Sequence, residues 1–213
     1  MKTAKLLLIV LALSLLLSGC RKQQPQPQNG GTGAETQAKA AVGQKAPPFT
    51  LTNYDGNDVS LSDYAGKVLV IEWFNYDCPF SRYSYETAHA LKDLKAKYAD
   101  KGVVFLSINS TASADPEKAK QVAQTHNLDY PILDDRSGHV GRAYGALTTP
   151  HIFIIDQQGN IAYNGALDNA PLGKPDSAEK INYADQALQQ LLAGQEISTP
   201  KTKPYGCSVK YAQ

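Results

Sequence analysis

Long apolar runs and helix-spaced apolar positions alternate along the chain from residue 42 onward. Residues 68–74 are apolar and largely β-branched, which predicts a strand covered on both faces. Apolar side chains then recur at helical spacing until Gly102, where we expect the helix to end; they are Tyr85, Ala88, Leu91, Leu94 and Tyr98. Residues 103–108 predict a second buried strand, and Asp115-Pro116-Glu117 has the N-cap, first-position proline and first-turn acid of another helix. This alternation is typical of an α/β sheet.

The second half of the chain carries a hairpin, a last helix and a tail. Residues 152–155 are apolar, and a Gln-Gln-Gly-Asn turn joins them to residues 161–165. Asp176 and Glu179 form a capping box that predicts the start of the last helix. Its apolar face consists of Ile181, Ala184, Leu188 and Leu191. Residues 195–213 follow as a C-terminal tail.

The first 20 residues have the pattern of a secretory signal. Lys2 and Lys5 precede an apolar run over residues 6–17, which is too short for a bilayer span of about 20 residues. The residues Leu-Ser-Gly-Cys that end at Cys20 resemble the bacterial lipobox, in which cleavage leaves the cysteine as a lipid-carrying N-terminus. The alternative is an ordinary signal with an incidental cysteine. We expect a protein of the cell envelope, anchored to a membrane through lipid on Cys20, with its domain in the periplasm or another extracytoplasmic space.

Composition supports one folded domain behind this anchor. Residues 21–41 are rich in Gln, Pro, Gly and Ala, which predicts a flexible linker, and we place the domain at 42–213 with the tail at 195–213. The 213 residues are 42% hydrophobic, enough for one core. The net charge is +1 and no long basic run is present, so we expect no nucleic-acid partner.

The chemistry of the chain centres on Cys78. It follows the first strand and a short polar turn, and Pro79 comes next as a good first helical residue. A cysteine at a helix N-terminus has its thiolate favoured by free N–H groups and the helix dipole, and Arg82 lies one turn further on. The pattern therefore predicts a nucleophilic thiolate. The alternative is a buried, inert cysteine.

A strand, a turn, Cys-Pro-Phe-Ser and a helix resemble the active-site region of the thioredoxin superfamily. Cys78 matches the first cysteine of the Cys-x-x-Cys motif, while Ser81 stands in place of the second. The resemblance makes Glu72 the buried acid that shuttles protons to the second cysteine, unless its side chain points off a sheet edge. It also implies that Pro79 and Phe80 lie beside bound substrate.

A second match lies at Thr149-Pro150, directly before an apolar strand. It resembles the cis-proline of the same superfamily, which packs beside the nucleophile and presents the preceding backbone to substrate. The resemblance implies a cis bond within contact distance of Cys78; the alternative is a trans proline at a strand start. His151 follows, either as a packed strand histidine or as a base or metal ligand.

Further motifs extend the resemblance over residues 42–211. A Gly-x-x-Ala-Pro-x-Phe-x-Leu lead-in begins at Gly43, a turn follows at Asp55-Gly56, and Lys-Pro-Tyr-Gly-Cys-Ser closes the match. Together they resemble a peroxiredoxin-like, thioredoxin-fold family within the alkyl hydroperoxide reductase and thiol-specific antioxidant group. The implied fold is α/β, a central mixed sheet flanked by helices, with an N-terminal β-hairpin extension and a C-terminal tail. Peroxiredoxins carry a threonine three residues before the cysteine, where this chain has Asn75, so protein disulfides and peroxides both stay open as substrates.

Cys207 is the expected partner of Cys78. If Cys20 is lipidated, these are the only two thiols left, and an oxidising envelope compartment favours a reversible disulfide between them. We expect protein thiols, disulfides or peroxides and an unidentified reductant as partners, and neither a cofactor nor a metal, because one cysteine and one histidine make a poor metal site. A non-catalytic binding module and a structural lipoprotein stapled by Cys78-Cys207 are the alternatives.

Overall fold

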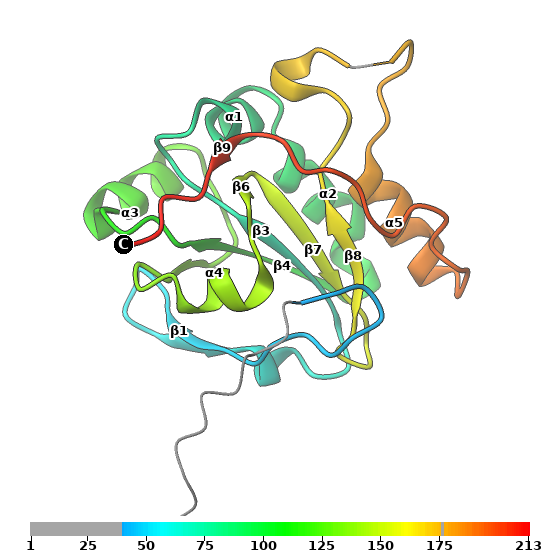
Figure 1. The fold of residues 1–213 in the computed structure, drawn as a ribbon, viewed down its shortest axis with the longest axis horizontal. Coiled ribbons are helices and arrows are strands. Elements are labelled where there is room, and N and C mark those ends of the chain that lie inside the picture. The colour runs from blue at the N-terminus through cyan, green and yellow to red at the C-terminus, as the bar shows by residue number, and fades with distance from the viewer. Residues whose placement is uncertain (1–39, 176) are drawn as a thin grey trace, which may run out of the picture. The chain divides into compact units, whose positions relative to one another are not determined.

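The computed structural model describes residues 40–175 and 177–213, which fold around one five-stranded mixed sheet in the order β5-β4-β3-β7-β8 (Figure 1). The strands are β3 (Val68–Trp73), β4 (Val103–Asn109), β5 (Ile132–Asp134), β7 (His151–Ile155) and β8 (Ile161–Gly165). β3 pairs in parallel with β4 and antiparallel with β7, so it is the central strand. The predicted signal peptide, Cys20 and the linker up to residue 39 lie outside the described residues.

Helices cover both faces of this sheet. They are α1 (Pro79–Arg82), α2 (Ala90–Tyr98), α3 (Pro116–Thr125), α4 (His139–Tyr144) and α5 (Tyr183–Leu192), with 3₁₀ turns at Leu61–Tyr64, Ala99–Lys101 and Pro171–Gly173. One core lies between the sheet and α2, α3 and α5, and contains Val70, Leu94 and Leu188. The other lies under α4 and contains Trp73 and Tyr144. Successive side chains of β3 point to opposite faces of the sheet, so this strand contributes apolar residues to both cores.

The helix predicted after Cys78 is not continuous. A π-helical segment, Tyr83–Thr87, follows α1, and His89 has a left-handed backbone with φ of 49° before α2 begins. Tyr85 and Leu94 are nevertheless both buried in the core, as predicted. Apolar spacing alone could not reveal the break. Gly102 ends the following turn with φ of 71°, in line with the prediction.

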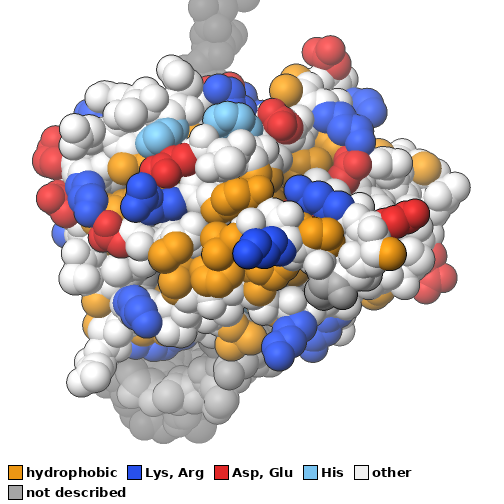
Figure 2. Space-filling view, turned by 90° about the horizontal axis from the view of Figure 1, so that it is seen from above, with side chains coloured by type: hydrophobic (Ala, Val, Ile, Leu, Met, Phe, Trp, Pro, Cys, Tyr) orange, Lys and Arg blue, Asp and Glu red, His pale blue; other side chains and the backbone are white. Residues whose placement is uncertain are grey.

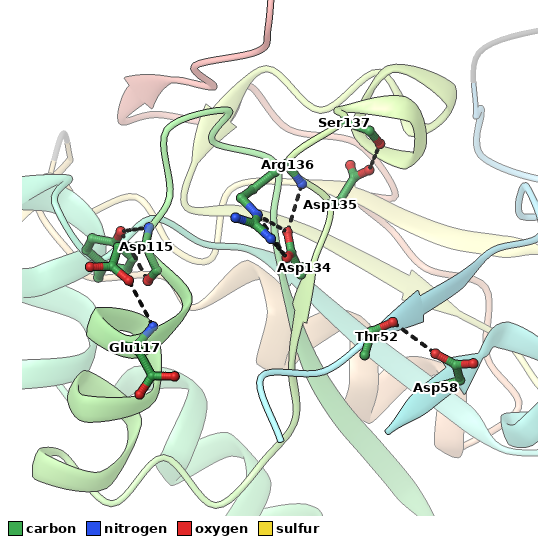
Figure 3. Close-up of polar contacts among 9 residues, drawn as sticks. Thr52, Asp58, Asp115, Glu117, Asp134, Asp135, Arg136 and Ser137 are labelled. Atoms are coloured by element: carbon green, nitrogen blue, oxygen red, sulfur yellow. Dashed lines mark hydrogen bonds and ion pairs between the residues drawn. The ribbon is translucent and has the colours of Figure 1, made fainter. Parts of the chain in front are cut away.

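The N-terminal extension is the predicted hairpin. β1 (Thr50–Thr52) pairs antiparallel with β2 (Asp58–Ser60), and a hydrogen bond from Thr52 Oγ1 to Asp58 Oδ1 joins their side chains at 2.9 Å (Figure 3). The hairpin packs on the same face as α4. The Ala40 amide donates to the Ala143 carbonyl at 3.1 Å, so the domain includes at least two residues that the sequence assigned to the linker.

Helix starts are a stricter test of the sequence patterns. α3 begins as predicted, with the Asp115 side chain accepting from the Glu117 amide at 3.0 Å (Figure 3). α5 begins later than predicted, since its N-cap is Asn182, whose side chain accepts from the Asp185 amide. Asp176 lies outside the described residues. None of the helices in the part of the chain that the structure describes is long and apolar enough to cross a bilayer.

The C-terminal tail is ordered and crosses the end of the sheet (red in Figure 1). Its residue Lys201 bridges to Asn164 of β8, and its strand β9 (Cys207–Ser208) pairs antiparallel with β6 (Thr148–Thr149). Beyond β9, the Lys210 carbonyl accepts from the Ala112 amide at 2.8 Å. The tail thus connects β8, β6 and the loop after β4.

Candidate active site

Cys78 lies where the central strand turns into α1. Its amide donates to the Asn75 carbonyl at 3.1 Å, and the Asn75 side chain accepts from the Asp77 amide at 2.8 Å, which closes the predicted polar turn. Cys78 has the extended backbone of an N-cap, and Pro79 is the first helical residue. The cysteine is only 2% exposed. The sequence pattern therefore placed the thiol correctly at the start of the helix.

The Thr149-Pro150 peptide bond is cis, and Thr149 contacts the thiol. The Cys78 thiol donates to the Thr149 carbonyl at 3.0 Å. Both features were predicted, and both are confirmed. Thr149 is 1% exposed, and its hydroxyl has no hydrogen-bond partner within the described residues while Cys78 is a thiol.

Cys207 lies opposite the same threonine. In the pairing of β6 with β9, Thr149 faces Cys207 and Thr148 faces Ser208. Cys78 and Cys207 are both free thiols, and each shifts the pKa of the other. Two cysteines 129 positions apart in the sequence thus meet over Thr149.

The two thiols differ in acidity. Burial raises the pKa of Cys78, but hydrogen bonds from the Cys207 side chain and amide, from Thr149 and from the Ser81 amide outweigh burial, so the net pKa lies below its ordinary value. Burial, followed by the hydrogen bond and charge of Cys78, raises the pKa of Cys207 to about 11. The arrangement favours one thiolate, on Cys78, facing one protonated thiol.

Arg82 does not have the predicted role. Its guanidinium pairs with Glu86, one turn along, at 3.2 and 3.3 Å, and its side chain is 55% exposed. Arg82 is absent from the groups that lower the pKa of Cys78. The opposite charge at the i+4 position draws the arginine outward. Ser81, predicted only as the replaced cysteine, is fully buried, and its backbone amide lowers the pKa of Cys78.

Glu72 lies in the middle of β3, so the alternative that its side chain points off a sheet edge is wrong. It is 3% exposed and accepts a hydrogen bond from the Ser107 hydroxyl at 3.2 Å. Burial raises the pKa of Glu72 to about 7, against a smaller lowering by Ser107. Its charge also acts on the hydroxyls of Tyr130 and Tyr205. A group that titrates near neutral pH can both accept and return a proton.

Phe80 and Tyr205 form a contact between α1 and the tail. Phe80 is half-buried and its ring centroid lies 6.0 Å from that of Tyr205, while Pro79 is exposed. The Tyr205 hydroxyl donates to Asp168 Oδ1 at 2.5 Å. Sequence reasoning missed Tyr205 and Asp168 as site residues. The only signal was the position of Tyr205, two residues before Cys207.

His151 is a packed strand histidine, which confirms the first of its two interpretations. Its Nδ1 accepts from the Leu147 amide at 3.2 Å, so Nε2 carries the proton to Asn164 Oδ1 at 2.7 Å. Burial lowers the pKa of His151 to about 4, which keeps the ring neutral. Across residues 40–175 and 177–213, no three His, Cys, Asp or Glu side chains gather as a metal site requires.

The fold and the paired thiols define a thioredoxin-fold thiol protein. The chain belongs to the AhpC/TSA family, whose sequence profile matches residues 42–164. The predicted fold and family resemblance are therefore confirmed.

Three proteins illustrate the likeness. The thiol-disulfide oxidoreductase ResA of Bacillus thuringiensis subsp. konkukian is 25% identical over 123 residues, which cover 58% of this chain and 68% of ResA. Chloroplastic peroxiredoxin Q of Gentiana triflora is 26% identical over 144 residues, 64% of each chain. The crystal structure of an uncharacterized conserved protein from Geobacillus kaustophilus, 33% identical, matches with a TM-score of 0.72 over 81% of this chain and 93% of that one. The chain is thus an oxidoreductase of the thioredoxin-like, thiol-disulfide type.

Proposed function

We propose that this protein is an envelope thiol oxidoreductase in which Cys78 is the nucleophile and Cys207 the resolving cysteine. The observation that carries the proposal is the pairing of a thiol of lowered pKa with a thiol of raised pKa over Thr149. A protein in which Cys78 and Cys207 form only a structural disulfide does not need two thiols of different pKa, because neither sulfur has to be a thiolate in a permanent disulfide.

The proposed reaction has two exchange steps. The Cys78 thiolate attacks one sulfur of a substrate disulfide, a mixed disulfide forms on Cys78, and the other substrate sulfur leaves as a thiolate. Cys207 then loses its proton and attacks Sγ of Cys78, which forms the Cys78-Cys207 disulfide and releases the second substrate sulfur. Two electrons pass to the substrate, and an external dithiol reductant returns them.

Other side chains support these steps. We assign Glu72 the role of accepting the proton that Cys207 loses. The pKa of Glu72 near 7 supports this role, as does the effect of its charge on the pKa of Tyr205, two residues before Cys207. When Cys78 ionises it no longer donates to the Thr149 carbonyl, and the buried Thr149 hydroxyl then has the thiolate as its acceptor. We assign Thr149, Pro150, Pro79 and Phe80 to the substrate platform, supported by the contact of Thr149 with the Cys78 thiol. We assign Arg82 no part in the reaction, because its guanidinium pairs with Glu86.

Peroxide reduction is the second candidate, favoured by the likeness to peroxiredoxin Q. In that reaction the Cys78 thiolate attacks a hydroperoxide oxygen, the alcohol leaves, and the resulting sulfenic acid condenses with Cys207 to give the disulfide and water. Hydroperoxide loss in the presence of reduced protein measures it. If disulfide exchange is the main activity, a small disulfide is consumed faster than a hydroperoxide at equal concentration.

Cys207→Ser tests the assignment of nucleophile and resolving thiol. With glutathione disulfide as the probe, this variant should accumulate one glutathionyl group on Cys78, because the second exchange step has lost its thiol. The unaltered protein should instead proceed to the Cys78-Cys207 disulfide. Peptide mapping by mass spectrometry locates the adduct.

The matched control is Cys78→Ser, which keeps Cys207. It should acquire little adduct, since burial still raises the pKa of Cys207 after the contributions of Cys78 are lost, and the thiol stays mostly protonated near neutral pH. An adduct that forms faster on Cys207 than on Cys78 would reverse the proposed roles.

We further propose that residues 1–20 are a lipoprotein signal, that Cys20 carries the lipid, and that the segment from 21 to about 40 tethers the domain outside the cytoplasm. Support comes from the lipobox-like residues before Cys20 and the Gln- and Pro-rich composition after it. Cys20→Ser should move the protein from the membrane to the soluble extracytoplasmic fraction. A variant that stays membrane-bound with its signal trimmed argues against lipidation.

A further inference from the structure

The C-terminal tail occupies the backbone edge beside the active-site cysteine. Thr149 pairs with Cys207, Thr148 pairs with Ser208, and the Val209 amide donates to the Leu147 carbonyl at 3.1 Å. An extended segment of another protein that brought its own cysteine to Cys78 would use the same backbone groups. The tail therefore holds the place that a protein substrate needs.

Gly206 adapts the tail to this place. Its φ is 128°, a backbone conformation that favours glycine, and a Cβ there would lie 2.2 Å from the Thr149 carbonyl oxygen. Any side chain at this position would push the tail away from β6. The close approach of Gly206 brings Cys207 against Cys78, directly after the point of contact.

Tyr205 fastens the tail on the other side of the site. Its ring packs on Phe80, and its hydroxyl donates to Asp168, which is 5% exposed. Asp168 in turn pairs with Lys180 at 3.3 Å. Of residues 204–209 only Val209 is buried, at 9% exposed, and it packs in the core under α4, where Tyr211 also lies. Residues 204–209 can therefore leave the site by giving up one core side chain, without opening the rest of the core.

The surface beside the tail suits a protein partner. Leu147, whose carbonyl binds the tail, is 61% exposed. Figure 2 looks onto the end of the molecule where β9 and α1 lie and shows apolar side chains gathered there, with Lys and Arg side chains around them. Such a surface gives an extended partner segment apolar contact next to the cysteine.

We propose that residues 204–209 are a strap that closes the strand-docking edge of β6, and that a protein disulfide reaches Cys78 only after the Tyr205-Asp168 fastening has opened. The inference rests on the proposed function in taking Cys78 as the reactive thiol. It adds that the partner is an extended, cysteine-containing protein segment and that the tail competes with it.

Two maleimides of different size test the strap. We define the ratio as the rate of Cys78 labelling by a bulky polyethylene-glycol maleimide divided by the rate with N-ethylmaleimide. Both reagents react with the same thiolate, so the ratio reports how accessible Cys78 is and does not depend on its pKa. The background is the full chain with Cys207→Ser, and labelling is quantified by peptide mapping at Cys78. Tyr205→Phe keeps the ring but removes a hydrogen bond to a carboxylate, so the ratio should rise roughly tenfold. Gly206→Ala should raise it at least as much.

Tyr98→Phe is the matched control, because it removes a Tyr-Asp hydrogen bond of 2.6 Å, to Asp185, that lies away from the tail. Its ratio should equal that of the background. If the ratio in Gly206→Ala is unchanged while Cys78 still reacts, the strap proposal is wrong but the proposed function stands. The same holds if the ratio rises as much in Tyr98→Phe as in Tyr205→Phe. A Cys78 that reacts with neither maleimide in any variant overturns the strap and the proposed function together.

Discussion

Cys78→Ser should lower the turnover of glutathione disulfide by at least about a hundredfold relative to the unaltered protein. In this variant Cys207 loses the hydrogen bond and charge of Cys78 that help to raise its pKa, but burial, the largest cause, still raises it. Cys207 therefore stays mostly protonated near pH 7. The greater nucleophilicity of a more basic thiolate offsets only part of the resulting shortage of thiolate. A lone Cys207 also has no second thiol to release the product. Turnover with dithiothreitol as reductant measures the loss.

Ser84→Ala is a suitable control for this prediction, since it removes another buried hydroxyl from the same helical region without touching either sulfur. It should keep most of the activity. A Cys78→Ser protein that retains more than about a tenth of the turnover would contradict the assignment of Cys78 as nucleophile.

Glu72→Gln should change how the stability of the domain depends on pH. Burial raises the pKa of Glu72 from 4.5 to about 7, so the folded state binds the proton more tightly than the unfolded state does. The free energy of unfolding therefore falls as pH rises through this range, and the whole loss is reached only above pH 7. The pKa shift corresponds to a loss of about 3 kcal/mol in the free energy of unfolding. Glutamine is neutral at every pH, so the Glu72→Gln variant should not show this loss.

Urea denaturation of the reduced proteins at about pH 4 and about pH 8 measures this difference. Between the lower and the higher pH, the free energy of unfolding of Glu72→Gln should rise by about 3 kcal/mol relative to that of the unaltered protein. Glu86→Gln is the control, because Glu86 pairs with Arg82 at the surface and a surface pair contributes little. If the free energies of unfolding of Glu72→Gln and the unaltered protein depend on pH in the same way, the pKa of Glu72 is not raised in the folded state and the prediction is wrong.

The sequence predicted most of what short-range patterns control. The apolar run of β3, the N-cap of α3, the hairpin of β1 and β2 and the position of Pro79 at the start of α1 depend on neighbouring residues, and all were confirmed. The cis Thr149-Pro150 bond was expected from the family resemblance and was also confirmed. The π-helical segment after α1 was missed because its apolar positions still fit a helical period. Arg82 was misplaced because proximity along a helix does not show which face a side chain takes when Glu86 competes for it.

The features that depend on distant parts of the chain were harder to predict. The pairing of Cys78 with Cys207 was expected from the number of thiols, but nothing in the residues indicated that a strand pair with Thr149 would place them. Tyr205 and Asp168 lie 37 positions apart, and neither resembles a site residue by itself. The lack of a side chain at Gly206 matters because it permits contact with the Thr149 carbonyl group, which only the folded chain brings there.

A redox titration of the full-length protein, with Cys78 and Cys207 followed by peptide mapping, shows whether the two thiols work as a redox pair. We expect a single reversible disulfide between these two cysteines with a midpoint potential above about −300 mV, because the acidic Cys78 is a good leaving group. A potential well below that value would identify a structural staple. The absence of any Cys78-Cys207 disulfide, at every potential, would contradict the paired-thiol site itself.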